Sequence, residues 1–588
     1  MIEKLKQNKI LLITFIIALV LIVTGVTFAL YNILFTGKKE QTIVVGDINF
    51  TYNEKTNGLS LNNDDILDNT SGINQEKYFD FDISLNSSNN TSITYQIAIE
   101  EDKTNTLSND KIKLYLTDQN NKKIKDPVNI SELKLDDKGY RKLYINTINQ
   151  NETQKYRLRA WVDVEKAYEI TNTGGTHSIK LNSASYKFKV NVYDTEKPID
   201  ESGANAPALA SNMIPVYYDK TNDVWKKADV SNTNKNNPWY SYNSTGEYKG
   251  MWANAVTVKD TNRQTYLNAT PGTVIPMDDI TTMWVWIPRF NAVTPSNYNG
   301  GTQEKPNAID VTFVKQNETA IDAFTFGTKN LSGFWYGKFE TSHTTLVSST
   351  TKNNLGCTNE TCSNANGIII KPNVTSLRYN NVSNFFYASR SMEQPNNSFG
   401  FVSSEVDTHM SKNNEWGAVA YLTQSIYGRC TNSTTCTEIG KNNNSNFITG
   451  YGAPAGSSDS VANGTYNTTL GKDASTTGTI YGIYDMAGGG WEFVMGLYNK
   501  TIGSSGFSSL PDSKYYNNYT STSYTGHALT ETAGWYSDDA YFVNSNIPWF
   551  IRGSDYSYGY TDAGVFSFGS SSGDANGYYG LRLVISSE

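Results

Sequence analysis

The sequence has few charged residues and almost no cysteine. Asp, Glu, Lys and Arg make up 18% of its 588 residues, and the net charge is −8. After the first few residues no block of Lys or Arg occurs, so the basic surface that is typical of a nucleic-acid-binding protein is missing. The sequence therefore predicts no nucleic-acid partner.

The polarity comes instead from Asn, Ser, Thr, Gly and Tyr, and 39 Tyr stand beside 11 Trp. Disordered chains are poor in aromatic residues, so this composition favours folded, β-rich domains. The length is too great for one hydrophobic core and predicts several domains of about 150 residues each.

The four cysteines form two short-spaced pairs, Cys357 with Cys362 and Cys430 with Cys436. Paired cysteines in an exported chain are typical of disulfide bonds that close loops. Two close pairs are also a zinc-ligand pattern, although zinc ribbons usually separate their cysteines by two residues. Disulfide bonds are our interpretation, with a zinc site and free thiols as the alternatives.

Residues 1–39 begin with lysines and continue into an apolar stretch over residues 10–35. About 20 apolar residues suffice to cross a bilayer, and the basic flank places the N-terminus inside. A cleaved signal peptide is the alternative, because Thr27 and Ala29 put small residues at the positions that a signal peptidase reads. Both interpretations predict an extracytoplasmic chain, anchored to the bacterial membrane or secreted.

Residues 40–193 alternate apolar and polar side chains, which is typical of half-buried antiparallel strands. Asn, Gly, Ser and Asp clusters separate these segments, so we expect a β-sandwich. The pattern resembles the camelysin and biofilm-fibre group of exported Gram-positive β-sandwiches. That resemblance implies a stalk or a fibre-forming domain. Residues 194–211 combine Pro, Gly and Ala without periodicity, and their composition predicts a linker.

Residues 212–588 interleave aromatic segments with turn residues, and the segment from 413 to 426 alone has helical spacing, with Asn414 as a candidate N-cap. Domains rich in long loops often use these loops for function. We expect Trp416, Met486, Trp491 and Met495 to lie in the core. Two arginines, Arg552 and Arg582, are expected to pin strand ends, with Glu415 and Glu492 as candidate partners.

Five segments in this region, taken in order, resemble the formylglycine-generating enzyme family, which includes the sulfatase-modifying factors. They are residues 286–290 with 336–341, 414–421, 482–493, 551–554 and 580–584. The resemblance implies a C-type-lectin-like fold for residues 212–588, which also include an aromatic-rich extension at their start. The predicted fold class is thus multidomain: an N-terminal transmembrane helix, an all-β sandwich, then an α+β C-type-lectin-like domain.

The family's oxidase chemistry needs cysteine thiolates beside the strand that here ends at Arg552 and Gly553. Residues 554–568 contain no cysteine, and no other side chain replaces a soft thiolate as a copper ligand. The four histidines (His177, His343, His409 and His527) lie in segments that we interpret as polar loops, and no nucleophile motif adjoins them. We therefore predict a non-catalytic form with no cofactor. Structural calcium stays open, and a residual oxidase is the least favoured alternative.

The stretch from 554 to 580 consists largely of Tyr, Ser, Asp, Gly, Thr and Ala and lacks Lys, Arg and Glu. Rigid tyrosine rings among small polar residues are typical of recognition loops. The same composition is compatible with variable proteins diversified by retroelements, and a soluble Gly/Tyr/Ser turn region is the bland alternative. The predicted ligand-binding residues are Asp555, Tyr556, Ser557, Tyr558, Tyr560, Asp562, Asn576, Tyr578 and Tyr579.

These observations predict a bacterial cell-surface protein, adhesin-like or receptor-like, that binds a glycan or a protein through a tyrosine-rich surface. A structural fibre or surface-layer component is the alternative, and it would depend on the sandwich over residues 40–193.

Overall fold

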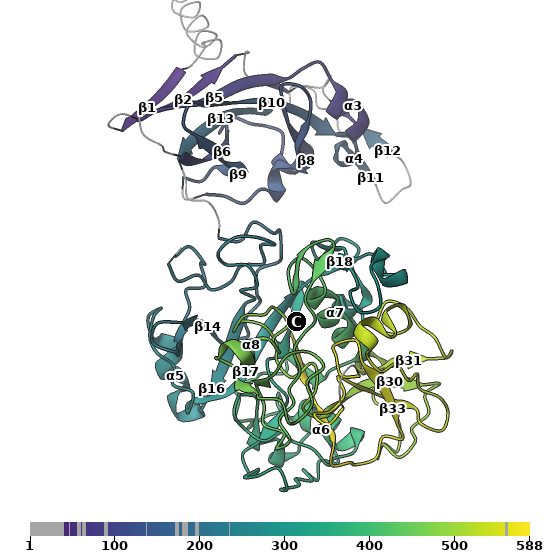
Figure 1. The fold of residues 1–588 in the computed structure, drawn as a ribbon. Helices are drawn as coiled ribbons and strands as arrows, with labels where there is room; N and C mark the ends of the chain where they lie inside the picture. The colour runs from purple at the N-terminus through teal and green to yellow at the C-terminus, as the bar shows by residue number, and fades with distance from the viewer. Residues whose placement is uncertain are drawn as a thin grey trace, which may run out of the picture. The chain divides into compact units, whose positions relative to one another are not determined.

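The computed structural model divides the chain into two compact units, Met1–Lys197 and Pro198–Glu588, which we describe one at a time (Figure 1). The structure describes residues 40–45, 48–55, 60–61, 66–87, 92–136, 138–170, 176–178, 186–194, 199–234, 236–558 and 562–587.

Two antiparallel sheets build the first unit, and the larger one also contains one short parallel pairing. The larger sheet runs in the order β1 (Glu40–Val45), β2 (Ile48–Glu54), β5 (Phe79–Ser87), β10 (Glu152–Asp163), β7 (Ile112–Asp118) and β8 (Lys123–Asn129), with β4 (Ile66–Leu67) parallel to β10. The smaller sheet runs in the order β3 (Ser60–Leu61), β13 (Tyr186–Asp194), β6 (Ser92–Glu101) and β9 (Arg141–Asn149). Two short helices, α3 (Asn69–Asn74) and α4 (Val164–Ala167), and the ladder of β11 (Tyr168–Ile170) with β12 (Thr176–Ser178) complete it.

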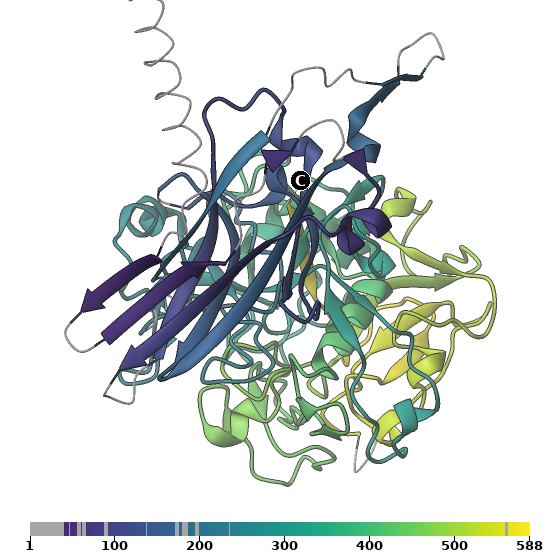
Figure 2. The same ribbon diagram turned by 90° about the horizontal axis from the view of Figure 1, so that it is seen from above.

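The alternating sequence pattern explains why these sheets have one apolar face. In β5, Phe81, Ile83 and Leu85 are fully buried, whereas the residues between them are partly exposed. They share one apolar core with Ile97 and Ile99 of β6, which belongs to the other sheet. The side-chain period of a strand thus turns every second residue inward, and the two inner faces pack together. Figure 2 shows the long strands of the larger sheet, purple to blue, side by side.

The second unit contains two larger sheets. The first runs in the order β15 (Val224–Lys227), β14 (Ile214–Asp219), β16 (Asn254–Val258), β17 (Ile280–Pro288), β22 (Gly333–Gly337), β35 (Leu583–Ser587) and β25 (Val406–Met410). The second runs in the order β31 (Asn517–Tyr519), β30 (Trp491–Tyr498), β32 (Trp549–Arg552) and β33 (Phe568–Ser571), and β34 (Tyr579–Leu581) pairs with β30. Because β35 lies between β22 and β25, the last strand of the chain is an inner strand of the first sheet.

Short two-stranded ladders and four helices connect these sheets. The ladders pair β18 (Phe290–Ala292) with β19 (Val311–Phe313), β20 (Thr325–Phe326) with β21 (Lys329–Asn330), β23 (Ser342–His343) with β24 (Ile368–Ile369), β26 (Cys430–Asn432) with β27 (Thr435–Cys436), and β28 (Tyr451–Gly452) with β29 (Gly464–Thr465). The helices are α5 (Asp260–Asn268), α6 (Val382–Ser391), α7 (Asn413–Thr423) and α8 (Thr469–Lys472).

The predicted fold class is wrong. The described chain is mostly β with few helices, and none of the helices in the described ranges is long and apolar enough to cross a membrane. The apolar stretch over residues 10–35 lies outside the described residues. In the second unit, Asn, Ser, Thr and Gly dominate between the aromatic segments. Their side chains or backbone freedom favour turns over helix, which explains why strands and loops replace the expected α+β layer.

The one segment with helical spacing does form a helix, α7. Its N-cap is Lys412 rather than the expected Asn414, because the Glu415 carboxylate accepts a hydrogen bond from the Lys412 backbone N–H at 2.8 Å. Every residue of α7 is buried, including the predicted core residue Trp416. Burial on all sides explains why its apolar spacing is weak in the sequence.

The core of the second unit is dense in large side chains. Trp416, Met486 and Met495 are fully buried and Trp491 is 5% exposed, which confirms the core positions expected from the sequence. Residues of the predicted linker also contact this unit. The Trp286 and Trp335 indole N–H groups donate hydrogen bonds to the backbone carbonyls of Asn205 (3.1 Å) and Ala208 (2.6 Å).

Both cysteine pairs form disulfide bonds, Cys357–Cys362 and Cys430–Cys436. The second closes the hairpin of β26 and β27, where the two cysteines face each other in register. Cross-linking a loop this short restricts the unfolded chain and contributes about 2 kcal/mol.

Replacing both Cys430 and Cys436 with serine is therefore expected to lower the free energy of unfolding of the second unit by about 2 kcal/mol. Urea unfolding followed by tryptophan fluorescence measures the change. The variant with serine at both Cys357 and Cys362 serves as comparison. Equal stability of the oxidised protein and the double-serine variant would contradict a stabilising role.

Candidate ligand-binding surface

The described recognition residues lie in or beside two neighbouring loops of the second large sheet. One loop follows β32 and carries Tyr556 and Tyr558, and the other precedes β34 and carries Tyr578. The Tyr558 and Tyr578 side chains are 38% and 46% exposed, whereas Tyr556 is half-buried. We call these three residues the tyrosine surface.

Two rings that the sequence did not single out hold the tyrosine surface together. The Phe447 ring meets Tyr556 edge-on at 4.8 Å between centroids and lies 5.9 Å from the Tyr578 ring. The Trp491 ring meets Tyr558 edge-on at 5.6 Å. Edge-to-face aromatic pairs of this kind add to the stability that burial alone provides. The loop residues therefore rest on buried side chains from distant parts of the chain.

A buried cation lies beneath the same surface. The Arg378 guanidinium lies 3.7 Å from the Phe447 ring centroid, donates one hydrogen bond to the Gly577 carbonyl, and donates another to the Ser349 carbonyl at 2.6 Å. Burial lowers the pKa of Arg378 from its ordinary value, although nearby Glu340 partly opposes this effect. Arg378 thus positions the loop before Tyr578 through its backbone.

Lys441 performs a similar role for the other loop. Its ammonium group donates a hydrogen bond to the Tyr558 carbonyl. Burial lowers the pKa of Lys441 to about 8, even though Asp555 and Asp562 favour the charged form. The backbone N–H of Tyr556 also donates to the Gly489 carbonyl at 2.8 Å. These contacts fix the loop's backbone and leave the Tyr558 ring partly exposed.

Several predicted residues support the loops instead of presenting a side chain to solvent. Asp555 is 4% exposed, and its carboxylate accepts hydrogen bonds from the Ser557 backbone N–H (2.8 Å) and hydroxyl (2.6 Å). The Asn576 side-chain oxygen accepts from the Tyr578 backbone N–H at 2.9 Å. Both arrangements are local Asx turns. Tyr579 packs its ring against Phe493 at 5.1 Å.

Two predicted residues remain, Asp562 and Tyr560. Asp562 contributes its backbone carbonyl, which accepts a hydrogen bond from the Ser554 hydroxyl at 3.0 Å. Tyr560 lies outside the described residues.

Under the loops, a turn of three glycines packs on a buried carboxylate. Gly489 has a φ of 71°, and a Cβ atom there would lie 2.3 Å from Glu340 Oε1. The same oxygen accepts a hydrogen bond from the Gly490 backbone N–H at 2.8 Å. Burial, with Asp485 and Glu492 nearby, raises the pKa of Glu340 well above its ordinary value. The turn therefore needs glycine because the carboxyl group occupies the space of a side chain.

Of the two arginines expected to pin strand ends, Arg582 pairs with the expected Glu492. Its Nε donates to Glu492 Oε2 at 3.0 Å, and its Nη2 lies 2.5 Å from Oε1. Arg552 instead donates to the Ala528 carbonyl at 2.9 Å. Glu415, the other expected carboxylate, lies in a different cluster, centred on His409.

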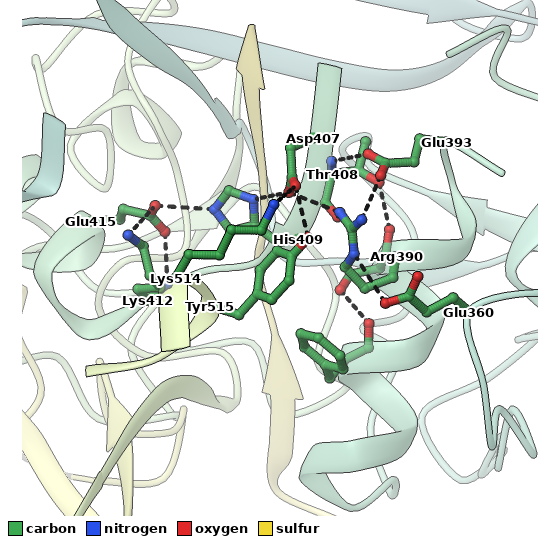
Figure 3. Close-up of polar contacts among 12 residues, drawn as sticks. Glu360, Arg390, Glu393, Asp407, Thr408, His409, Lys412, Glu415, Lys514 and Tyr515 are labelled. Atoms are coloured by element: carbon green, nitrogen blue, oxygen red, sulfur yellow. Dashed lines mark hydrogen bonds and ion pairs between the residues drawn. The ribbon is translucent and has the colours of Figure 1, made fainter. Parts of the chain in front are cut away.

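The His409 cluster is a group of buried, oppositely charged side chains in the second unit (Figure 3). Contrary to the expected polar loop, His409 lies in strand β25 and is fully buried. Its Nδ1 lies 3.0 Å from Asp407 Oδ1, and its Nε2 lies 3.0 Å from Glu415 Oε1. Lys412 adjoins Glu415 at 3.4 Å. Residues 406–410 are apolar only at Val406 and Met410, so the sequence signal for this strand was weak.

Asp407 has three more partners besides His409. Arg390 Nη1 lies 2.8 Å from Asp407 Oδ1, and the Tyr515 hydroxyl donates to Asp407 Oδ2 at 2.8 Å. Lys514 Nζ lies 3.2 Å from the same Oδ2 (Figure 3). Arg390 also contacts Glu393 at 2.6 Å. With both imidazole nitrogens bound and no exposed surface, His409 has the geometry of a structural ion-pair centre.

Two other histidines, His527 and His343, are likewise held by neighbours. His527 Nε2 lies 2.7 Å from Asp322 Oδ2, and its Nδ1 lies 2.7 Å from the Tyr519 hydroxyl. His343 Nε2 contacts the Asn364 carbonyl at 2.9 Å. Within the described residues, no group of three or more His, Cys, Asp and Glu side chains is arranged to hold a metal ion.

No protein-family model matches the sequence, and no curated protein is significantly similar to it.

Proposed function

We propose that this protein is a ligand-binding protein of the bacterial cell surface whose second unit recognises a glycan or a protein through the tyrosine surface. The observation that carries the proposal is the pair of partly exposed rings, Tyr558 and Tyr578, on loops whose backbones are fixed by Lys441 and Arg378. Rings held this way lose little conformational entropy on binding, which is what recognition surfaces require.

An extracytoplasmic location is part of this proposal. Two disulfide bonds support it, because such bonds persist in oxidising compartments. A binding role, rather than an oxidase role, is supported by the sequence from 554 to 568, which has no thiolate to bind copper.

We also propose descent from the formylglycine-generating enzyme family. Contacts between the quoted segments support it. Arg582, from the last segment, donates to the carbonyls of Gly337 (2.8 Å) and Tyr484 (3.0 Å), which belong to two other segments. A Cβ atom on Gly553 would lie 3.2 Å from the Trp416 ring. Diversification of residues 554–580 by a retroelement would leave a near-repeat of the coding sequence and a reverse transcriptase gene nearby, which sequencing the locus would reveal.

The binding proposal predicts that removing two rings abolishes recognition. The full chain is screened on glycan and protein arrays, and the ligand found is then titrated against the double variant Tyr558→Ala/Tyr578→Ala. Each exposed ring at the centre of an interface contributes about 2 kcal/mol, so we expect a loss of affinity of about 100-fold or more.

Matched controls separate recognition from folding. Tyr524→Ala removes a ring that is 39% exposed and lies against His527, and it is expected to leave the affinity unchanged. Tyr558→Phe retains the ring and should bind within about threefold of the unaltered protein. Undiminished binding by the double alanine variant would refute the proposed site.

A further inference from the structure

A second site is indicated by a cleft of about 650 Å³ that shares no lining residue with the tyrosine surface. Its walls come from the hairpin of β20 and β21, the start of α7, and the segment that leads into β31. This volume lies within the range of ligand-binding pockets, about 300–1,000 Å³.

Three lysines line the cleft: Lys329, Lys412 and Lys514. Lys412 and Lys514 hold their ammonium groups 5.1 and 5.0 Å from the centroid of one ring, Phe326, which also lines the cleft. The Phe326 ring stacks on the His409 imidazole, with 4.8 Å between the ring centroids. The cleft therefore lies directly against the His409 cluster. Two cations are thus held at one end of the cleft by the buried network beneath it.

The lining carboxylates have partners within the fold. Asp322 Oδ2 lies 2.7 Å from His527 Nε2. Asp512 Oδ1 accepts a hydrogen bond from the Lys514 backbone N–H at 3.0 Å. Lys412 is only 3% exposed, and its ammonium group lies 3.4 Å from the Glu415 carboxylate. This distance is longer than a charge-assisted hydrogen bond of about 2.8 Å. An ammonium group has three donors, so Lys412 can donate to an anionic oxygen in the cleft.

An acceptor also lines the cleft and lacks a donor. Asn414 is 3% exposed, and its side-chain oxygen is buried without a hydrogen-bond partner in the described part of the chain. A buried acceptor without a donor is unfavourable, and a ligand hydroxyl that donates to it would remove this cost. Thr325 and Thr328 add hydroxyl groups to the lining. A ligand with an anionic group and hydroxyl donors would match this lining.

We propose that this cleft binds an acidic saccharide. Its carboxylate or sulfate group is held by Lys412 and Lys514, and one of its hydroxyls donates to the Asn414 side-chain oxygen. A free inorganic anion would satisfy the lysines but not Asn414, and a neutral sugar would satisfy Asn414 but not the lysines. The proposal is independent of the tyrosine surface, because the two sites use different residues.

The test is calorimetric titration of the full chain with tetrasaccharides of hyaluronan (carboxylate) and chondroitin sulfate (carboxylate and sulfate), with neutral chitotetraose for comparison. At least one acidic tetrasaccharide is expected to bind about tenfold or more tightly than chitotetraose, because each charge-assisted contact is strong. Comparing the two acidic sugars shows whether carboxylate alone is enough.

Variants then assign the contact. Lys514→Gln is expected to lower the affinity about tenfold, whereas Lys514→Arg keeps the charge and stays within about threefold. Lys329→Gln, on a residue outside the His409 cluster, is a second variant with an expected loss of about threefold. Lys472→Gln, on α8, and Tyr558→Ala/Tyr578→Ala should leave the affinity unchanged, which distinguishes this site from the tyrosine surface.

Three results would overturn the proposal. The first is the absence of binding to both acidic tetrasaccharides at millimolar concentration. The second is equal binding of tetraglutamate, which would assign the cleft to acidic peptides. The third is unchanged affinity in both Lys514→Gln and Lys329→Gln when thermal unfolding shows that each variant is folded.

Discussion

Replacing Arg582 with alanine is expected to lower the free energy of unfolding of the second unit by about 3–5 kcal/mol. Arg582 is fully buried and neutralises Glu492, which is 1% exposed. It also donates to the backbone carbonyls of Gly337 and Tyr484. The alanine variant leaves a buried carboxylate without its cation and two carbonyls without a donor. Urea unfolding followed by tryptophan fluorescence measures the change.

Two further variants define the cause. Arg582→Ala/Glu492→Gln removes both charges and should be less destabilised than the sum of the two single variants, because no uncompensated charge remains. Lys259→Ala removes a lysine whose side chain is 55% exposed and lies 3.9 Å from Asp279, and it should cost about 1 kcal/mol or less. An unfolding free energy for Arg582→Ala within about 1 kcal/mol of the unaltered protein would contradict a structural role for this pair.

The sequence was a good guide to strands whose residues alternate, and a poor guide to the fold class. Strand β5 was predictable because Phe81, Ile83 and Leu85 alternate with polar residues. The second unit offers no such regular period. Its inner strands, such as β17, are buried on both faces, and its connections are fixed by side-chain hydrogen bonds between distant segments. One segment with helical spacing, which forms α7, was too little evidence for the predicted α+β domain.

The candidate site was predictable in part, since composition located the loops but not their supports. Tyr556 and Tyr578 are 22 residues apart and meet through Phe447, which lies more than 100 residues earlier in the chain. No local motif links these positions. By contrast, the inward role of Asp555 follows from a local signal, because Asp followed two residues later by Ser is typical of an Asx turn.

The His409 cluster explains why the second unit should lose stability at alkaline pH. Burial opposes the charged form of His409, but the Glu415 and Asp407 carboxylates outweigh burial and raise its pKa above the ordinary 6.5. With His409 protonated, the buried carboxylates of Asp407 and Glu415 share its imidazolium between them. Deprotonation would remove the cation that these two carboxylates share.

Two buried carboxyl groups act in the same direction. Burial raises the pKa of Glu393 and of Glu492 to about 7 in each case, although an arginine lies beside each of them. A group whose pKa is higher in the folded state stabilises the fold below its unfolded pKa, and this contribution is lost as the pH rises through the folded value. For the carboxyl groups the loss extends from about pH 4.5 to 7. For His409 it begins near pH 6.5.

We therefore expect the free energy of unfolding of the second unit to fall as the pH rises from about 4.5 through 7, and to continue falling above about pH 6.5 as His409 loses its proton, by up to about 1.4 kcal/mol per pH unit for each proton released. Urea unfolding at several pH values measures the slope. His409→Gln should be less stable at about pH 6, by about 3 kcal/mol, because Asp407 and Glu415 lose a shared partner. It should also show a shallower slope above about pH 6.5, because the titrating imidazole is gone. His343→Gln, outside the cluster, should retain the slope of the unaltered protein. A flat pH dependence, or the same slope in His409→Gln, would show that the imidazole is not the cation that balances these carboxylates.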